Sequence, residues 1–155
     1  MAKRFKRLLS QWTWKGDVLT QDDIKDWYGF IYLIEDIDNN KKYIGEKSFW
    51  SFRTPKGKSN KKKYISDWEK YESSNKQLKS LVTESKEYKH DKFKFTILAL
   101  CADKSVMKLT EAKWILGLGA LMSEEYYNDN IRITVMNTYK NYNERVNELD
   151  MKEFM

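Results

Sequence analysis

Two runs of apolar, β-branched and aromatic residues lie close together in the chain, at residues 29–36 and 41–46. The segment between them ends in Asp-Asn-Asn, residue types that favour a tight turn. Two such runs around such a segment predict an antiparallel β-hairpin. Each run contains one tyrosine, Tyr32 in the first and Tyr43 in the second, and these are the first candidates for a role beyond packing.

Three longer stretches downstream show the periods of regular structure. Residues 73–88 place apolar side chains on one helical face after the polar start Ser-Ser-Asn, which predicts a capped amphipathic helix. Residues 92–102 alternate at first and then become continuously apolar, a pattern typical of a central strand. Residues 103–122 predict the most regular helix of the chain, with Asp103 or Ser105 as its cap.

The remaining segments have weaker patterns. Residues 1–14 predict a short helix, and the acidic residues after Thr20 suit the start of another. Residues 48–53 predict a short helix before a basic loop, and residues 131–136 predict a strand. A small amphipathic helix is expected after that strand, through Val146, Leu149 and Phe154. The regular elements follow the order ββαβα, which predicts a small α/β domain.

The composition narrows the class of protein. A chain of 155 residues suits one domain with a single core. Its 29 lysines and arginines exceed its 23 aspartates and glutamates, for a net charge of +6. This surplus fits a polyanionic partner such as nucleic acid, and it fits equally a basic protein with no anionic ligand. With one cysteine, no Cys/His cluster and no uncharged run near the roughly 18 residues that span a bilayer, we expect a soluble cytoplasmic protein without structural zinc.

The hairpin and the segment after it carry a recognisable spacing. The tripeptide FIY ends at Tyr32, and YIG begins eleven residues later at Tyr43. Arg53 follows Gly45 by eight residues and is one of only five arginines in the chain. On a ββαβα pattern, this ordered set resembles the signature of the GIY-YIG nucleases. Phe30 stands where the first motif of that family has its glycine.

Two residues further along extend the resemblance. Glu111, in LTEAKWI, lies on the predicted helix after the third strand, where the family carries its metal-binding glutamate. Asn128, in YYN, matches a short element near the end of the nuclease core. The resemblance covers residues 29–128 and is to the phage-encoded, homing-type endonucleases of the family. It implies a three-stranded, mainly antiparallel sheet flanked by helices.

The resemblance also implies a division of the chain. Residues 1–28 would form a basic, helical N-terminal extension. Residues 29–128 would be the nuclease core, and residues 129–155 a C-terminal extension that packs on the core.

The implied activity is metal-dependent hydrolysis of DNA phosphodiester bonds. One Mg²⁺ or Mn²⁺ ion would be held by Glu111, in keeping with the one or two carboxylates that Mg²⁺ commonly uses. Arg53 would clamp the scissile phosphate with its planar guanidinium. Tyr32 and Tyr43 would share a sheet face toward the helix of Glu111 and one pocket with Arg53. A neighbouring cation and the metal would lower the pKa of the general base, for which we favour Tyr43, and Tyr32 would orient water or phosphate.

Supporting roles fall to three groups of residues. Gly45 would provide a bend and a bare backbone beyond the second strand. Asn128 would tie the backbone near the site. The basic loop is either a solvated segment or a track for DNA phosphates. Its lysines are Lys56, Lys58, Lys61, Lys62 and Lys63.

Other classes of function remain open at this point. The chain could be a catalytically inactive nucleic-acid-binding protein, or a protein that binds a host factor, with the same fold. For a nuclease, double-stranded DNA is the expected substrate, and no membrane is involved. Only about 25 residues follow the implied core, so either target specificity is weak, or the chain ends or a partner would supply it.

Overall fold

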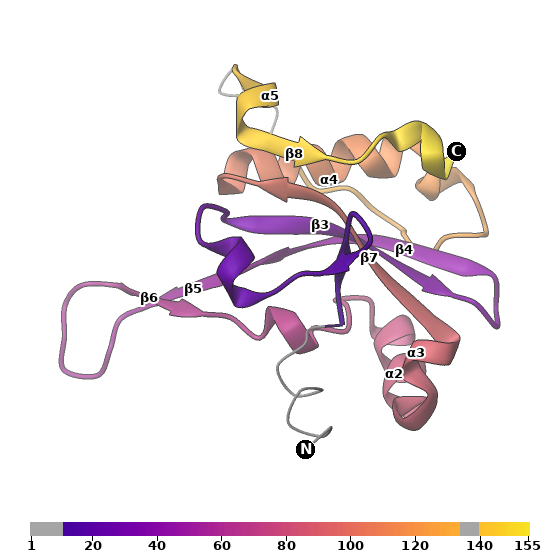
Figure 1. Cartoon of the computed structure of the whole chain (residues 1–155), viewed down its shortest axis with the longest axis horizontal. Coiled ribbons are helices and arrows are strands. Elements are labelled where there is room, and N and C mark those ends of the chain that lie inside the picture. Colours follow the sequence, from indigo (N-terminus) through magenta and orange to yellow (C-terminus); the bar gives the residue numbers. More distant parts are fainter. Residues whose placement is uncertain (1–10, 134–139) are drawn as a thin grey trace.

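The computed structural model describes residues 11–133 and 140–155, and its centre is a six-stranded sheet in the order β2-β1-β7-β3-β4, with β8 also paired to β7 (Figure 1). The three long strands are β3 (Gly29–Asp36), β4 (Lys41–Ser48) and β7 (Phe93–Cys101). β3 pairs antiparallel with both of the others, so the predicted hairpin and the predicted central strand are confirmed. The α/β class and the mainly antiparallel sheet are also confirmed.

Three short strands enlarge the sheet beyond the three that were predicted. They are β1 (Thr13–Trp14), β2 (Asp17–Val18) and β8 (Val146–Glu148). β1 lies parallel to β7 at Thr96, and β8 lies antiparallel to the end of the same strand. Segments near both ends of the chain therefore pair with the edge of β7 that β3 leaves open. Local sequence patterns do not predict such pairing between distant segments.

The two faces of β3 are covered by different parts of the chain. Phe30, Tyr32 and Ile34 point into a cluster that also contains side chains of α2 (Lys76–Glu84). Ile31 and Leu33 point into the opposite cluster, which contains side chains of α4 (Lys104–Gly117). Because both faces are buried, β3 reads as a nearly continuous apolar run. Figure 1 shows α4 and α2 on opposite sides of the sheet.

The helices begin where capping residues precede them. The Asn75 side chain accepts a hydrogen bond from the Leu78 amide at the start of α2, and Asp103 accepts one from the Val106 amide at the start of α4. The predicted helix at residues 73–88 is shorter, because α2 ends at Glu84. Two short helices follow it, η3 (Lys86–Tyr88) and α3 (Lys89–Lys92). After α4, Gly119 adopts a left-handed conformation before η4 (Ala120–Met122).

The helix predicted at residues 48–53 is wrong. That segment contains β5 (Trp50–Arg53), which pairs antiparallel with β6 (Lys62–Ile65) in a separate two-stranded ribbon. Figure 1 shows this β5–β6 ribbon projecting from the body of the molecule. Cations stack on aromatic rings across the pair, with Arg53 4.2 Å from the Tyr64 ring centroid and Lys63 4.0 Å from that of Trp50. The alternation of large and polar residues in WSFR is therefore a strand period and not a helical one.

Of two other weak predictions, one is confirmed and one is wrong. Thr20 and Asp23 form a capping box at η1 (Gln21–Ile24), so the start predicted after Thr20 is confirmed as a single turn. The predicted C-terminal amphipathic helix is wrong, because β8 and η6 (Met151–Phe154) follow the short helix α5 (Tyr142–Arg145).

The other two weak predictions lie partly outside the described residues. Of the strand predicted at 131–136, residues 131–133 form no strand and the rest are not described. In the helix predicted at 1–14, Thr13–Trp14 are the strand β1, and residues 1–10 are not described.

The division into a core and two extensions stays a prediction. Residues on both sides of the proposed core nevertheless pack against it, since Trp12 is fully buried and Phe154 contacts the Trp114 ring. Cys101 is buried, and burial raises the pKa of its thiol to about 12. Across residues 11–133 and 140–155, none of the helices has the length and apolarity needed to cross a bilayer.

Asp103→Ala should lower the free energy of unfolding by about 1–2 kcal/mol, because the first turn of α4 loses its cap. Asp103→Asn should recover most of this loss, since asparagine caps equally well. The hydrogen bond from Arg145 lowers the pKa of Asp103 below its ordinary 3.8. The advantage of wild type over the alanine variant should therefore be constant at higher pH and shrink below about pH 4. Urea unfolding from pH 3 to pH 8 measures both effects, and equal loss in both variants would contradict the capping role.

Candidate active site

A solvent-open cavity of about 720 Å³ lies where the edge of β4 meets α4 and the start of α2. We call it the β4–α4 pocket. Tyr43 and Glu46 of β4, Lys108 and Glu111 of α4, and Asn128 are among the residues that line it. Three residues of the predicted site, Tyr43, Glu111 and Asn128, therefore lie at one pocket although they are far apart in the sequence.

Asn128 closes the free edge of β4 at this pocket. Its side-chain oxygen accepts a hydrogen bond from the Ile44 amide at 2.9 Å, and its side-chain nitrogen donates one to the Ile44 carbonyl at 2.8 Å. The amide group thus pairs with the strand as another strand would. The main chain of Lys42 is bonded to Glu125 and Tyr127 in the same segment. Asn128 holds the backbone between Tyr43 and Gly45, and its own polar atoms are engaged in doing so.

Tyr43 presents its hydroxyl to the pocket from the face of the sheet that α2 covers. The hydroxyl lies 3.0 Å from the Ser74 hydroxyl, at the residue before the Asn75 cap of α2. Burial raises the pKa of Tyr43 above the ordinary value of a phenol. In the protein alone, Tyr43 is therefore a neutral hydrogen-bonding group at neutral pH.

Tyr32 lies beside Tyr43 but does not reach the same opening. The two rings are on one sheet face, with centroids 6.1 Å apart, because Tyr32 pairs with Gly45 and Ile34 pairs with Tyr43. Tyr32 is fully buried, and its hydroxyl, close to Ser73, makes no hydrogen bond of ordinary geometry. Burial raises the pKa of Tyr32 well above that of a free phenol.

The structure requires glycine at position 45 because of packing, and not because of the predicted bend. It lies within the regular register of β4, opposite Tyr32. A Cβ at this position would overlap the end of the buried Tyr32 ring and its hydroxyl. The glycine of YIG therefore gives room to the tyrosine of the first motif.

The predicted relation of the phenols to Glu111 needs correction. α4 packs on the opposite sheet face, so neither tyrosine points at this helix, and Tyr43 and Glu111 meet only around the edge of β4. The expected lowering of a phenol pKa by a cation and a metal stays a prediction, and in the protein alone the pKa of each phenol is raised. Burial dominates at both rings.

Glu111 shares its side of the pocket with one carboxylate and one ammonium. Burial, and then repulsion by Glu46, raise the pKa of Glu111 to about 7. Lys108, one turn earlier on α4, forms an ion pair with Glu46 and partly offsets these effects on Glu111. In the described ranges 11–133 and 140–155, no three histidine, cysteine or carboxylate side chains form a group that could hold a metal. A pair of carboxylates still suits Mg²⁺, which takes its other ligands from water and phosphate.

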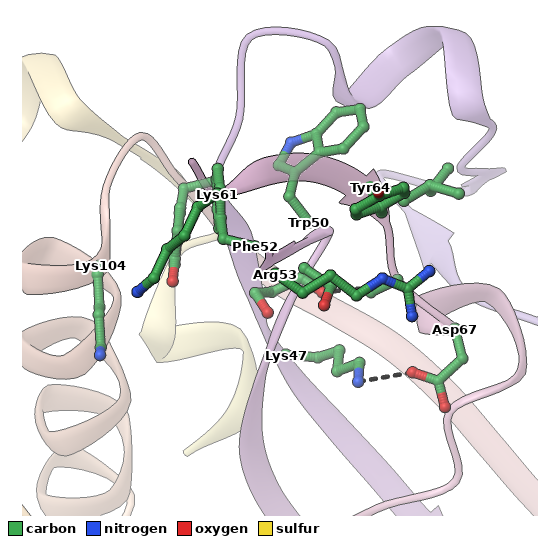
Figure 2. A pocket seen from close by; sticks show the side chains of 13 residues that line it. Lys47, Trp50, Phe52, Arg53, Lys61, Tyr64, Asp67 and Lys104 are labelled. Carbon is green, nitrogen blue, oxygen red and sulfur yellow. Dashed lines mark hydrogen bonds and ion pairs between the residues drawn. The ribbon is translucent and has the colours of Figure 1, made fainter. Parts of the chain in front are cut away.

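Arg53 lies in a second cavity, of about 610 Å³, between the β5–β6 ribbon and the start of α4. Figure 2 shows Arg53 beside Tyr64 in this cavity, which we call the ribbon pocket, with Lys104 on the helix at one side. Lys47 also lines it and forms a 2.7 Å ion pair with Asp67. The expectation that Arg53 shares one pocket with both tyrosines and Glu111 is therefore wrong for this structure.

The two pockets nevertheless adjoin. Lys47, in the ribbon pocket, has its ammonium 4.3 Å from the ring centroid of Tyr71, which lines the β4–α4 pocket. Lys104 and Lys108 lie one helical turn apart on α4 and line one pocket each. A band of cations therefore connects Arg53 to the carboxylates.

The lysines of the predicted DNA track are exposed on the β5–β6 ribbon. Lys62 and Lys63 belong to β6, and Lys61 lines the ribbon pocket. Lys56 and Lys58 lie in the loop between the strands. The five ammonium groups sit on an element that projects from the body, where a large ligand can reach them (Figure 1).

Sequence reasoning missed the residues that connect the predicted ones. Glu46 follows the YIG tripeptide directly, and Lys104, Lys108 and Glu111 share a helical face by their spacing of four and three. That spacing was available in the sequence. Ser74 had no comparable signal, because its contact with Tyr43 depends on how α2 docks on the sheet.

Comparison with known protein families identifies a match to this chain. A family model described as "Putative endonuclease segE, GIY-YIG domain" matches residues 12–131, which is more than half of the chain. The chain belongs to the GIY-YIG family. No curated protein and no solved structure gives a significant match.

The match to the GIY-YIG family covers the elements that form the two pockets. The matched region includes the hairpin with both tyrosines, the β5–β6 ribbon, α4 and Asn128. It also includes β1, and it ends before β8. The GIY-YIG domain is an endonuclease domain, so the pocket that joins its motif residues is the candidate active site.

Glu111→Gln should gain stability relative to wild type as the pH rises, when a chelator keeps divalent ions away. The pKa of Glu111 lies near 7 in the folded protein against an ordinary 4.5, so wild-type stability falls between these pH values, because the carboxyl ionises in the unfolded chain while it stays protonated in the folded one. Glutamine does not titrate. We expect the variant to be more stable by about 1–3 kcal/mol at pH 8 and no more stable at pH 4.5. Urea unfolding at both pH values measures the difference, and parallel pH profiles would contradict it.

Proposed function

We propose that the protein is a metal-dependent endonuclease that hydrolyses phosphodiester bonds of double-stranded DNA, and that it is phage-encoded and acts in the host cytoplasm. The observation that carries the proposal is the meeting of Tyr43 and Glu111 at one solvent-open pocket in a GIY-YIG domain. The adjoining cations of the ribbon pocket support an anionic polymer as the substrate. Specificity would come from the chain ends, a second copy of the chain or another protein.

Glu111 would hold one Mg²⁺ or Mn²⁺ ion. When bound, such an ion neutralises charge on the scissile phosphate and on the leaving oxygen. Glu111 lies partly buried at the pocket wall, where burial and Glu46 oppose its ionisation. A cation at this carboxylate would remove that cost, which supports Glu111 as the ligand.

Arg53 would bind a pair of phosphate oxygens from the ribbon pocket, which adjoins the β4–α4 pocket. The face of its guanidinium rests on Tyr64. Its N–H groups point outward in the plane of the group, so stacking orients them without using them. Stacking also limits the rotamers of an exposed arginine, which lowers the entropy lost when a phosphate binds.

Tyr43 would act on the attacking water, as the tyrosine whose hydroxyl faces the pocket. The Ser74 hydroxyl at 3.0 Å fixes the direction of that phenol. Tyr32 would support Tyr43 through ring contact and through Gly45, without touching the substrate. Its complete burial supports that weaker role.

The exposed lysines would track the DNA backbone on the β5–β6 ribbon. The group consists of Lys56, Lys58, Lys61, Lys62 and Lys63. Such contacts are independent of sequence, and they make affinity fall with salt. They account for binding, whereas the β4–α4 pocket accounts for cleavage.

One observation favours a different function, a nucleic-acid-binding or host-factor-binding protein without catalysis. Arg53 and Glu111 line separate pockets, and a nuclease needs both at one phosphate. The band of cations through Lys47 and Lys104 would serve binding alone equally well. Cleavage assays separate the two functions directly.

The wild-type protein should cut linear duplex DNA with Mg²⁺ or Mn²⁺ and stop cutting with a chelator, and Glu111→Gln should cut at less than about one hundredth of the wild-type rate. DNA affinity of the variant should stay within a few fold. Glu148→Gln, which alters an ion-paired glutamate of β8, is the matched control and should cut normally. Gel-based cleavage under single-turnover conditions gives the rates. Binding without cleavage by wild type, on linear, branched and single-stranded DNA alike, would favour the non-catalytic alternative.

Tyr43→Phe should reduce the single-turnover rate by about 10² to 10⁴, as expected for loss of a proton-transfer group. Tyr32→Phe removes a buried hydroxyl that has no well-formed hydrogen bond, so its stability should be equal to or above that of wild type. Its rate should fall by less than about tenfold. Rates and urea unfolding of both variants test the assignment. A greater loss of rate in Tyr32→Phe than in Tyr43→Phe would reverse it.

A further inference from the structure

We propose that Glu46 is a second carboxylate ligand of the divalent ion, opposite Glu111, and that Lys108 occupies this pair of carboxylates when no ion is bound. The inference rests on the proposed metal-dependent function and adds to it a residue that lies outside the predicted GIY-YIG set. It also gives Lys108 a second position, because an ion bound by the two carboxylates would displace the Lys108 ammonium.

The position of Glu46 is unusual for a charged residue. It alternates with Gly45 along β4 and shares its sheet face with Ile44, which is buried in the cluster against α4. The side chain is only 15% exposed. A glutamate so placed is retained only when its charge has partners.

Glu46 is incompletely satisfied by the residues around it. One carboxylate oxygen pairs with the Lys108 ammonium. The other oxygen, Oε2, is inaccessible to solvent and has no hydrogen-bond partner within the described part of the chain. A buried carboxylate oxygen without a partner is unfavourable, so this site is built for a ligand atom that the described side chains do not supply.

The second carboxylate and the ammonium lie at the same place. Glu111 is three residues after Lys108, on the same face of α4, and it is close enough to Glu46 for their charges to repel. Lys108 is attracted by both carboxylates. The Lys108 ammonium is paired with Glu46 and lies within the field of Glu111, which marks a position that favours positive charge.

The chemistry of this pair suits a small, hard cation. Two carboxylates, with the remaining positions filled by water and phosphate oxygens, form a common Mg²⁺ or Mn²⁺ site. The repulsion that a second buried carboxylate creates is then offset by two positive charges in place of the single charge of Lys108. When the ion binds, the Lys108 ammonium can contact the phosphate in the pocket.

Glu148 of β8, which pairs with Lys113 of α4, shows how an ordinary ion pair differs. Both carboxylate oxygens of Glu148 are bonded, at 3.0 and 2.9 Å from Lys113 Nζ, and Trp114 Nε1 donates to one of them at 3.1 Å. Glu148 is 21% exposed, close to the exposure of Glu46. It therefore matches Glu46 in residue type, burial and lysine partner, and it lacks the unpartnered oxygen.

The test is Mn²⁺ binding to the full chain without DNA, measured by isothermal titration calorimetry and by electron paramagnetic resonance of the free ion. Wild type should bind one Mn²⁺. Glu46→Gln should weaken the affinity by about tenfold or more, the range seen when groups that support a metal are removed, whereas Glu148→Gln should leave it unchanged. Lys108→Met should strengthen binding, because it removes the competing ammonium.

A double variant excludes an indirect effect. Glu46→Gln alone could weaken binding simply by releasing Lys108 to pair with Glu111. In the Lys108→Met background that route is gone, so a further tenfold loss on adding Glu46→Gln assigns the effect to the carboxylate itself. Circular dichroism and urea unfolding of each variant verify that the fold is kept.

The outcomes separate this inference from the proposed function. Equal Mn²⁺ affinity in Lys108→Met with and without Glu46→Gln, together with loss in Glu111→Gln, overturns the role of Glu46 and leaves a metal-dependent nuclease. Failure of wild type to bind Mn²⁺ at millimolar concentration also overturns it, because a two-carboxylate site should bind in the free protein. DNA binding without cleavage by wild type in the presence of Mg²⁺ or Mn²⁺ would instead overturn the proposed function, whatever the result with Glu46.

Discussion

The pairing register of β3 with β4 is the constraint on which the site depends. Tyr32 lies opposite Gly45 and Ile34 opposite Tyr43, so both phenols share one face, while Ile44 and Glu46 take the other. A shift of one residue would exchange these faces, since successive side chains of a strand point in opposite directions. The register is held at the turn by Asp36. Its carboxylate accepts hydrogen bonds from the Asn39 side chain and from the buried Tyr127 hydroxyl at 2.7 Å.

The edge of β4 is the reason that the two faces can cooperate. A residue in a central strand reaches only the layer on its own side, whereas side chains of an edge strand can meet around the edge. Asn128 pairs with Ile44 and so protects the exposed backbone from association with other strands. The pocket opens directly beside this closure, where Tyr43 approaches from one face and Glu46 from the other. An active site of this form needs the sheet to end there.

The sequence predicted the hairpin, the central strand and α4 because their patterns are local. The resemblance also implied that Tyr32 and Tyr43 share one face, which the β3–β4 register bears out, but the local pattern does not say which helix covers that face. Since α2 and α4 each bury one side, the tyrosines could equally have faced either, and they face α2. The predicted position of Arg53 was wrong for a related reason. The strand character of its segment depends on pairing with Lys62–Ile65, which lies across a loop. The strands β1 and β8 depend on contacts between distant segments in the same way.

The distribution of charge explains how carboxylates can work at a phosphate. A polyanion that approaches Glu46 and Glu111 without compensation would be repelled. Lys108 supplies one compensating charge at the carboxylates, and Lys47 and Lys104 continue the positive surface toward Arg53. The exposed ribbon lysines extend it further, and under the proposed function they would act at longer range and raise the local concentration of DNA. Phosphate binding therefore demands positive charge at the pocket, whereas metal-dependent catalysis demands carboxylates at the same place. Under the proposed function, a divalent ion at the carboxylates would satisfy both demands, because it would turn the acidic side of the pocket into a site for phosphate.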